Sequence, residues 1–152
     1  MIKQGVKAGI YAGPFNFLPP NIVFCPLAAV PKRDSNKVRI IHNLSYPYNN
    51  SVNSHIEKHH STVEYLTIDH CIQIISKMGK NCLIAKNDVK NAYHNLILAP
   101  DSFHFMGFSW DGQIYFSTTL PMGCSISCQR FECMSTAVQW ILQNKLSVTH
   151  TR

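Results

Sequence analysis

The chain has 152 residues, of which 45% are hydrophobic and 14% are charged. This length fits one domain or part of one, and the composition excludes a disordered or low-complexity protein. The net charge of +6 is compatible with a polyanionic partner but does not require one. No apolar run reaches the roughly 18 residues of a membrane span, and the first residues lack a secretory signal, so we expect an intracellular protein without membrane contact.

The first half of the chain predicts an irregular arm followed by a hairpin and a long loop. Glycine and proline punctuate residues 1–20, which we expect to be irregular. Residues 22–24, 27–30 and 38–41 are apolar and suited to strands, and the polar residues 32–37 between them predict a turn. Residues 43–63 are rich in Asn, Ser, His and Pro and predict a loop.

The second half predicts two helices, a short strand and a second hairpin. Thr67 is a suitable cap for a helix that ends at Met78, before Gly79. Residues 82–85 form an apolar run of strand length. Asp111 and Gly112 predict a tight turn between strands at 103–110 and 113–118, and an apolar stripe predicts a helix over 125–143. The pattern predicts an α+β fold, with helices packed on an antiparallel or mixed sheet.

The cysteines and histidines give no firm metal or disulfide pattern. The six cysteines lack a CxxC pair, and without a secretory signal we expect free thiols. His55, His59 and His60 lie close together, but only Glu57 accompanies them at a ligand spacing, so a solvated loop is the better interpretation. A small domain stabilised by metal or disulfides is nevertheless one alternative reading of the whole chain.

Two groups of charged residues stand out. Asp88 follows the apolar run at 82–85, where a carboxylate could bind a hard cation such as Mg²⁺. From the spacing alone, a cap for a short helix at 89–94 is the favoured interpretation of Asp88. The predicted first hairpin carries four cations, which could bind phosphates or form a solvated tip: Lys32, Arg33, Lys37 and Arg39.

From about residue 8 to residue 149, the chain resembles a reverse transcriptase, specifically the fingers and part of the palm of DIRS-type retrotransposon polymerases. The matching stretches are residues 25–32, residues 37–47 (KVRIIHNLSYP), residues 88–93 (DVKNAY), Gly107-Phe108 and residues 120–125 (LPMGCS), with Phe131 following. His94 stands where an arginine is common in the group. Cys128 replaces a proline usual in many other reverse transcriptases and resembles the DIRS type.

The resemblance implies a polymerase site that uses two Mg²⁺ ions. Asp88 would be the first catalytic aspartate and a metal ligand, supported by the backbone carbonyl of Val89. Tyr93 would be the aromatic gate that selects deoxynucleotides. The remaining residues implied to bind the nucleotide are Lys32 and Arg39 at its phosphates, Asn91 and Ala92 along the triphosphate, and Met122 and Gly123 against the nucleotide and the template base.

By this resemblance the chain divides into an irregular N-terminal arm (1–20), a fingers-like hairpin, loop and helix (21–80), a partial palm (81–149) and a truncated end (150–152). The family's next motif contains two adjacent aspartates, and no Asp-Asp pair occurs here. We therefore expect an incomplete palm and no polymerase activity from the chain as given. In the intact protein the partners would be an RNA or DNA template-primer and deoxynucleotides. The main alternative is a non-catalytic nucleic-acid-binding remnant.

Overall fold

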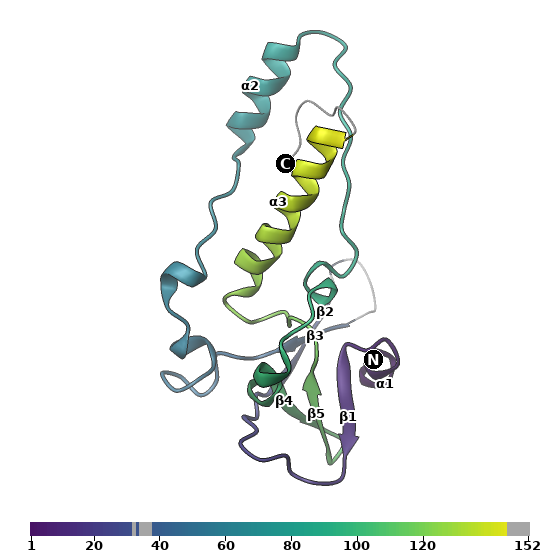
Figure 1. The fold of residues 1–152 in the computed structure, drawn as a ribbon, viewed down its shortest axis with the longest axis vertical. Helices are drawn as coiled ribbons and strands as arrows, with labels where there is room; N and C mark the ends of the chain where they lie inside the picture. The colour runs from purple at the N-terminus through teal and green to yellow at the C-terminus, as the bar shows by residue number, and fades with distance from the viewer. Residues whose placement is uncertain (32, 34–37, 146–152) are drawn as a thin grey trace.

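The computed structural model describes residues 1–31, 33 and 38–145 (Figure 1). Lys32, most of the predicted turn at 32–37 and the predicted end at 150–152 lie outside the described residues. The fold is α+β, as predicted, with two antiparallel sheets. Both sheets lie toward one end of the long axis, and helices α2 (Ile68–Met78) and α3 (Ser127–Lys145) lie toward the other.

The two predicted hairpins are confirmed. Strands β2 (Leu27–Pro31) and β3 (Val38–His42) pair antiparallel from Leu27 opposite His42 to Pro31 opposite Val38. Strands β4 (Gly107–Trp110) and β5 (Gln113–Ser117) pair around the Asp111-Gly112 turn. The fourth strand is shorter than predicted, because residues before Gly107 form a 3-10 helix, η4 (Pro100–Met106).

The expectation of an irregular arm at 1–20 is wrong. Residues Ile2–Lys7 form helix α1, and Tyr11–Phe15 form strand β1, which pairs with β5 at the edge of the three-stranded sheet. Pro14 is tolerated there because an edge strand leaves one row of backbone groups unpaired, and the pairing is irregular between Ala12 and Phe15. Buried Ile2 and the ring of Tyr11, in edge contact with Phe108, hold this segment on the sheet.

Two small apolar clusters form the core. Ile2, Phe108 and Tyr115 are buried together beneath α1, with Leu27 and Ile40 of the two-stranded sheet packed against them. The second cluster joins four buried residues from distant parts of the chain: Cys25, Leu44, Met106 and Cys124. This second cluster contains both Leu44 and Cys124, so it brings two of the resemblance motifs into one place.

The predicted helices are confirmed with small shifts at their ends. α2 begins after Thr67, whose backbone N–H donates to His70 Nδ1 at 3.2 Å, and it ends at Met78, with Gly79 as its C-cap. α3 begins two residues later than predicted. The apolar stripe of α2 does not pack on a sheet as expected: Ile68, Ile72 and Ile75 are exposed.

The predicted strand at 82–85 does not form within the described part of the chain. Residues 82–89 have no regular secondary structure and pair with no described strand. Leu83 is 97% exposed and Ile84 is 72% exposed. An apolar run forms a strand only where a neighbouring strand supplies hydrogen bonds and cover, and no described segment supplies them here.

All six cysteines have free thiols. Among the described residues, no group of three or more His, Cys, Asp or Glu side chains could hold a metal ion, and no helix is long and apolar enough to cross a bilayer.

Candidate functional site

The loop of residues 120–127 is fixed at both ends. At its start, the Leu120 N–H donates to the Leu96 carbonyl oxygen at 2.8 Å. At its end, the buried Ser127 hydroxyl donates to the Pro121 carbonyl oxygen at 2.8 Å. Because Ser127 is also the first residue of α3, this bond ties the loop to the start of the helix. The loop that carries Met122 and Gly123 therefore has a defined shape.

Asn53 clamps the middle of the same loop. This residue begins the 3-10 helix η1 (Asn53–His55). Its side-chain amide donates to the Gly123 carbonyl oxygen at 2.8 Å and to Ser45 Oγ at 2.9 Å, and its Oδ1 accepts from the Ser125 N–H at 2.9 Å. One side chain thus satisfies two backbone groups of the loop, as a paired strand would.

Gly123 lies directly against the end of strand β3. Its φ is +109°, and a Cβ added there would collide with the His42 carbonyl oxygen. Glycine permits both this conformation and this close approach. Arg39 lies three residues before His42 on the same strand and is exposed. The structure therefore joins the Met122-Gly123 loop to the strand that carries Arg39.

A short ladder connects the 120–127 loop to the Asp88–Tyr93 region. The Leu98 N–H donates to the Thr118 carbonyl oxygen at 2.9 Å, and the Leu120 N–H donates to the Leu96 carbonyl oxygen. Ile97 and Thr119 form the antiparallel bridge between these two bonds. His94 adds a side-chain contact, Nδ1 to Thr119 Oγ1 at 3.0 Å. Residues 94–98 are consequently held beside the strand that leads into the loop.

Tyr93 is anchored on the start of α3. It lies in the 3-10 helix η3 (Ala92–Asn95), and its hydroxyl is 3.1 Å from Cys128 Sγ. Its ring meets the Phe131 ring edge to face, with centroids 5.8 Å apart. The contact with Cys128, with partial burial, raises the pKa of Tyr93 to about 12. The ring is half-buried and fixed from one side by two residues of one helix.

Asn91 and Ala92 form the backbone turn just before Tyr93. Asn91 has a left-handed conformation with φ of 54°, and its carbonyl oxygen accepts from the His94 N–H at 2.8 Å. Ala92 is half-buried. Asn91, not Asp88, occupies the N-cap position, and no side chain caps the helix. The alternative role of Asp88 as a helix cap is therefore wrong.

Asp88 and Val89 stand apart from these contacts. Both residues are exposed and belong to the segment at 82–89 that has no regular structure. The Asp88 carboxylate forms no ion pair with any residue that the structure describes. A two-ion Mg²⁺ site needs several shared carboxylates, because two divalent cations repel about four times as strongly as unit charges at the same distance. Asp88 alone does not meet that need, so these residues do not fit a two-ion site.

The sequence did not predict the two residues whose side chains fix the 120–127 loop, Asn53 and Ser127. Asn53 is one of several asparagines in the polar loop at 43–63, and nothing in its local pattern distinguishes it from Asn49 or Asn50. Ser127 lies at helical spacing with the apolar residues of the last helix, and its buried hydroxyl ties that helix to Pro121. A hydroxyl at the expected start of a helix is the one signal that could have singled it out.

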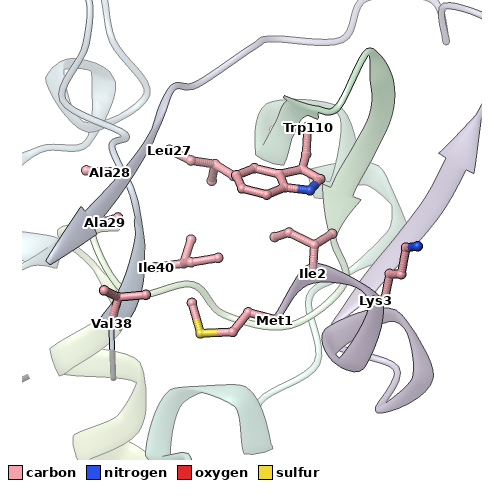
Figure 2. Close-up of a pocket in the computed structure, with 9 residues that line it drawn as sticks. All are labelled: Met1, Ile2, Lys3, Leu27, Ala28, Ala29, Val38, Ile40 and Trp110. Atoms are coloured by element: carbon pink, nitrogen blue, oxygen red, sulfur yellow. The ribbon is translucent and has the colours of Figure 1, made fainter. Parts of the chain in front are cut away.

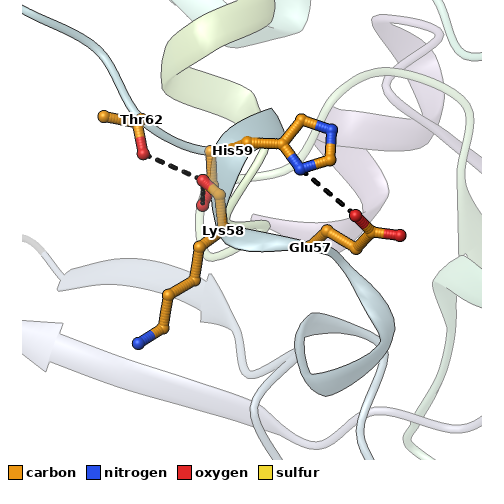
Figure 3. Close-up of polar contacts among 5 residues, drawn as sticks. Glu57, Lys58, His59 and Thr62 are labelled. Carbon is orange, nitrogen blue, oxygen red and sulfur yellow. Dashed lines mark hydrogen bonds and ion pairs between the residues drawn. The ribbon is translucent and has the colours of Figure 1, made fainter.

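The histidine cluster is an exposed, self-contained turn (Figure 3). Lys58–His60 form the 3-10 helix η2. His59 Nδ1 lies 3.2 Å from Glu57 Oε2, and the Thr62 hydroxyl donates to the Lys58 carbonyl oxygen at 2.9 Å. Both members of the His59–Glu57 pair are well over half exposed. These contacts agree with the interpretation of 55–60 as a solvated loop.

An apolar cavity lies elsewhere, between α1, the β2–β3 hairpin and Trp110 (Figure 2). It has a volume of about 440 Å³, and none of its lining residues is a predicted nucleotide-binding residue. Figure 2 shows Ile2 and Ile40 on opposite sides of the space, with the Trp110 indole across it. The cavity continues the apolar cluster beneath α1 and is separate from the 120–127 loop.

Neither a family model nor a curated protein sequence matches the chain. Solved structures do. A foamy viral protease-reverse transcriptase in complex with double-stranded DNA superposes with a TM-score of 0.61 and 21% identity, over 94% of this chain and 22% of that one. The native prototype foamy virus protease-reverse transcriptase gives 0.50 and 19%, over 95% and 17%. The chain thus spans about a fifth of these proteins, and its fold is that of part of a reverse transcriptase.

Proposed function

We propose that these residues are the fingers and the first part of the palm of a retrotransposon RNA-directed DNA polymerase of the DIRS type. The role proposed for this region is to bind the incoming deoxynucleotide and the template-primer, with Arg39 and Lys32 at the phosphates. Met122 and Gly123 would lie against the nucleotide and the template base.

The observation that carries this proposal is the junction of three motifs at residues 120–127. Gly123 packs on the end of the strand that bears Arg39, and the ladder at Leu96 and Leu98 leads from the same loop to Tyr93. The absence of a side chain at Gly123 allows the loop to pack directly on the end of β3, which brings the two motifs together. A cationic side chain and an aromatic ring near one loop suit a nucleotide, which has phosphates and a sugar to recognise.

We further propose that the 152 residues alone do not catalyse polymerisation. The sequence holds eight acidic residues and no adjacent pair of aspartates. Asp88 is exposed, and the described residues place no carboxylate cluster around it. The test is primer extension on RNA and DNA templates with Mg²⁺ and deoxynucleotides. We expect no extension product. Template-dependent extension that Asp88→Ala abolishes would contradict this part of the proposal and assign Asp88 a catalytic role.

Binding is tested separately, by titrating a fluorescent RNA–DNA duplex at several salt concentrations. Arg39→Ala should weaken binding and reduce the slope of log affinity against log salt by about one. Lys7→Ala is the matched control, because it removes an exposed cation of α1, outside the junction. Equal effects of the two variants would contradict a phosphate contact at Arg39.

The alternative is a nucleic-acid-binding remnant without a nucleotide site. It is favoured because Asp88 is exposed and forms no ion pair with a described residue. It predicts salt-dependent duplex binding that Asp88→Ala does not weaken, together with no measurable affinity for free deoxynucleotides. Affinity for a deoxynucleotide therefore separates the two proposals.

A further inference from the structure

Cys128 and Tyr93 form a contact that the motifs alone do not explain. The Tyr93 hydroxyl and the Cys128 sulfur are 3.1 Å apart, although 35 positions separate the residues in the sequence. Both side chains are half-buried. Either atom could be the donor, but a phenol is a good donor and a thiol a weak one. We therefore describe the Tyr93 O–H as donating to Cys128 Sγ.

A second residue of α3 also restricts the position of the Tyr93 ring. Phe131, one turn further along α3, meets the ring edge to face and restricts its tilt. The Tyr93 hydroxyl contacts Cys128 Sγ, a sulfur that also forms a hydrogen bond with Tyr65. Cys128 thereby fixes where the far end of the ring lies.

Cys128 is itself held firmly. It follows Ser127, whose hydroxyl bonds to the Pro121 carbonyl oxygen in the loop that carries Met122 and Gly123. A displacement of the loop is therefore passed to Cys128 and from there to Tyr93. Through these contacts, the Tyr93 ring has a fixed position relative to the 120–127 loop.

We propose that Cys128 is a positioning residue. It holds the Tyr93 ring in the position in which the ring discriminates deoxynucleotides from ribonucleotides. This inference rests on the proposed function, with Tyr93 as the aromatic gate for deoxynucleotides that the resemblance implies. A ring that is free to tilt admits a 2′-hydroxyl, whereas a ring held at its hydroxyl end does not.

The experiment compares the affinities for dATP and ATP, which differ only at the 2′ position, in the full chain with Mg²⁺. In the unmodified chain dATP should bind more tightly. Cys128→Ala should reduce the preference by about two- to tenfold, which is the range that one neutral hydrogen bond contributes. Tyr93→Phe keeps the ring and loses the same bond, so it should give the same loss, and the double variant should lose no more.

Two further variants separate positioning from general damage to the helix. Cys128→Ser retains an acceptor at the same place and should restore most of the preference. Cys133→Ala removes an exposed thiol of α3 and should leave it unchanged. Ultraviolet absorption of tyrosinate gives an independent readout, since the pKa of Tyr93, about 12 in the unmodified chain, should fall toward 10 in Cys128→Ala.

The outcomes distinguish this inference from the proposal on which it rests. Failure of both dATP and ATP to bind would overturn the proposed nucleotide site, and with it the role of Tyr93 as a gate. Binding with an unchanged preference in Cys128→Ala would overturn the role of Cys128 alone. A preference that falls equally in Cys133→Ala would also overturn it, because the loss would then reflect damage to α3.

Discussion

The side-chain amide of Asn53 donates to the carbonyl oxygen of Gly123 at 2.8 Å across 70 positions of sequence. The same side chain accepts from the Ser125 N–H, so a residue of the polar loop determines the shape of the loop proposed to contact the nucleotide. Removing it leaves backbone groups without partners, which costs more than the bonds themselves contribute.

Asn53→Ala should lower the free energy of unfolding by about 1–3 kcal/mol, because three hydrogen bonds are lost together. Urea unfolding followed by tryptophan fluorescence measures the change. Asn50→Ala, an exposed position in the same loop, serves as the control and should be nearly neutral. A similar loss in both variants would mean that the clamp contributes nothing specific.

Gly123→Ala should destabilise the chain far more than Gly112→Ala. Both glycines have positive φ, which costs alanine about 1–2 kcal/mol. Only at Gly123 would the new methyl group also meet backbone, the His42 carbonyl, for about a further 1–3 kcal/mol. Unfolding by urea compares the two variants directly. Equal losses would show that the loop moves away from β3 at little cost.

Acidification should destabilise the fold through His42 and His94. Burial lowers the pKa of both imidazoles below the ordinary value of 6.5, and the hydrogen bond of His42 to the Gly107 carbonyl opposes this only in part. The unfolded chain therefore takes up protons that the folded chain resists, so stability falls as the pH drops below about 6.5. The slope of unfolding free energy against pH should decrease in His42→Gln and in His94→Gln. A slope that neither variant changes would contradict this assignment.

The six thiols should react in an order set by burial. Cys71 and Cys133 are exposed, whereas Cys25 and Cys124 are buried and burial raises the pKa of both thiols, which suppresses the reactive thiolate. Titration with a chromogenic disulfide should show two fast and two slow thiols, and all six after denaturation. Fewer than six without reductant would support a disulfide-stabilised domain instead.

The exposed apolar segment at 82–85 should make the isolated chain prone to aggregate. Leu83→Lys replaces a side chain that is 97% exposed and should reduce light scattering at a fixed protein concentration. Asn87→Lys adds the same charge nearby without removing an apolar group, so its effect should be smaller. If the two variants behave alike, net charge and not the apolar segment controls aggregation.

Local signals in the sequence predicted much of the fold. The helix after Thr67, the Asp111-Gly112 turn and the pairing of the first hairpin depend on residues close together, and each was predicted correctly. Strand β1 was missed because Gly13 and Pro14 suggest irregular chain, while the partner that makes it a strand is β5, far along the sequence.

Less of the candidate site could be predicted. The resemblance led to Tyr93, Met122 and Gly123, and the structure brings all three to the 120–127 loop and the start of α3. The residues that hold them in place, Asn53 and Cys128, act through contacts over 70 and 35 positions, which no local pattern encodes. The predicted strand before Asp88 was wrong because an apolar run reveals suitability for a sheet but not the presence of a neighbouring strand.

The pairing of β1 with β5 also constrains how the chain folds during synthesis. The Thr118 hydroxyl bonds to the Gly9 carbonyl oxygen, 109 positions earlier, and β1 pairs with residues 114–117. β1 can therefore complete its pairing only after β5 has been synthesised. Contacts of such long sequence separation slow folding. Through that interval Ile2, Tyr11 and Phe15 lack the partners that cover them in the folded chain, and apolar surface exposed in this way makes a partly folded chain prone to aggregate.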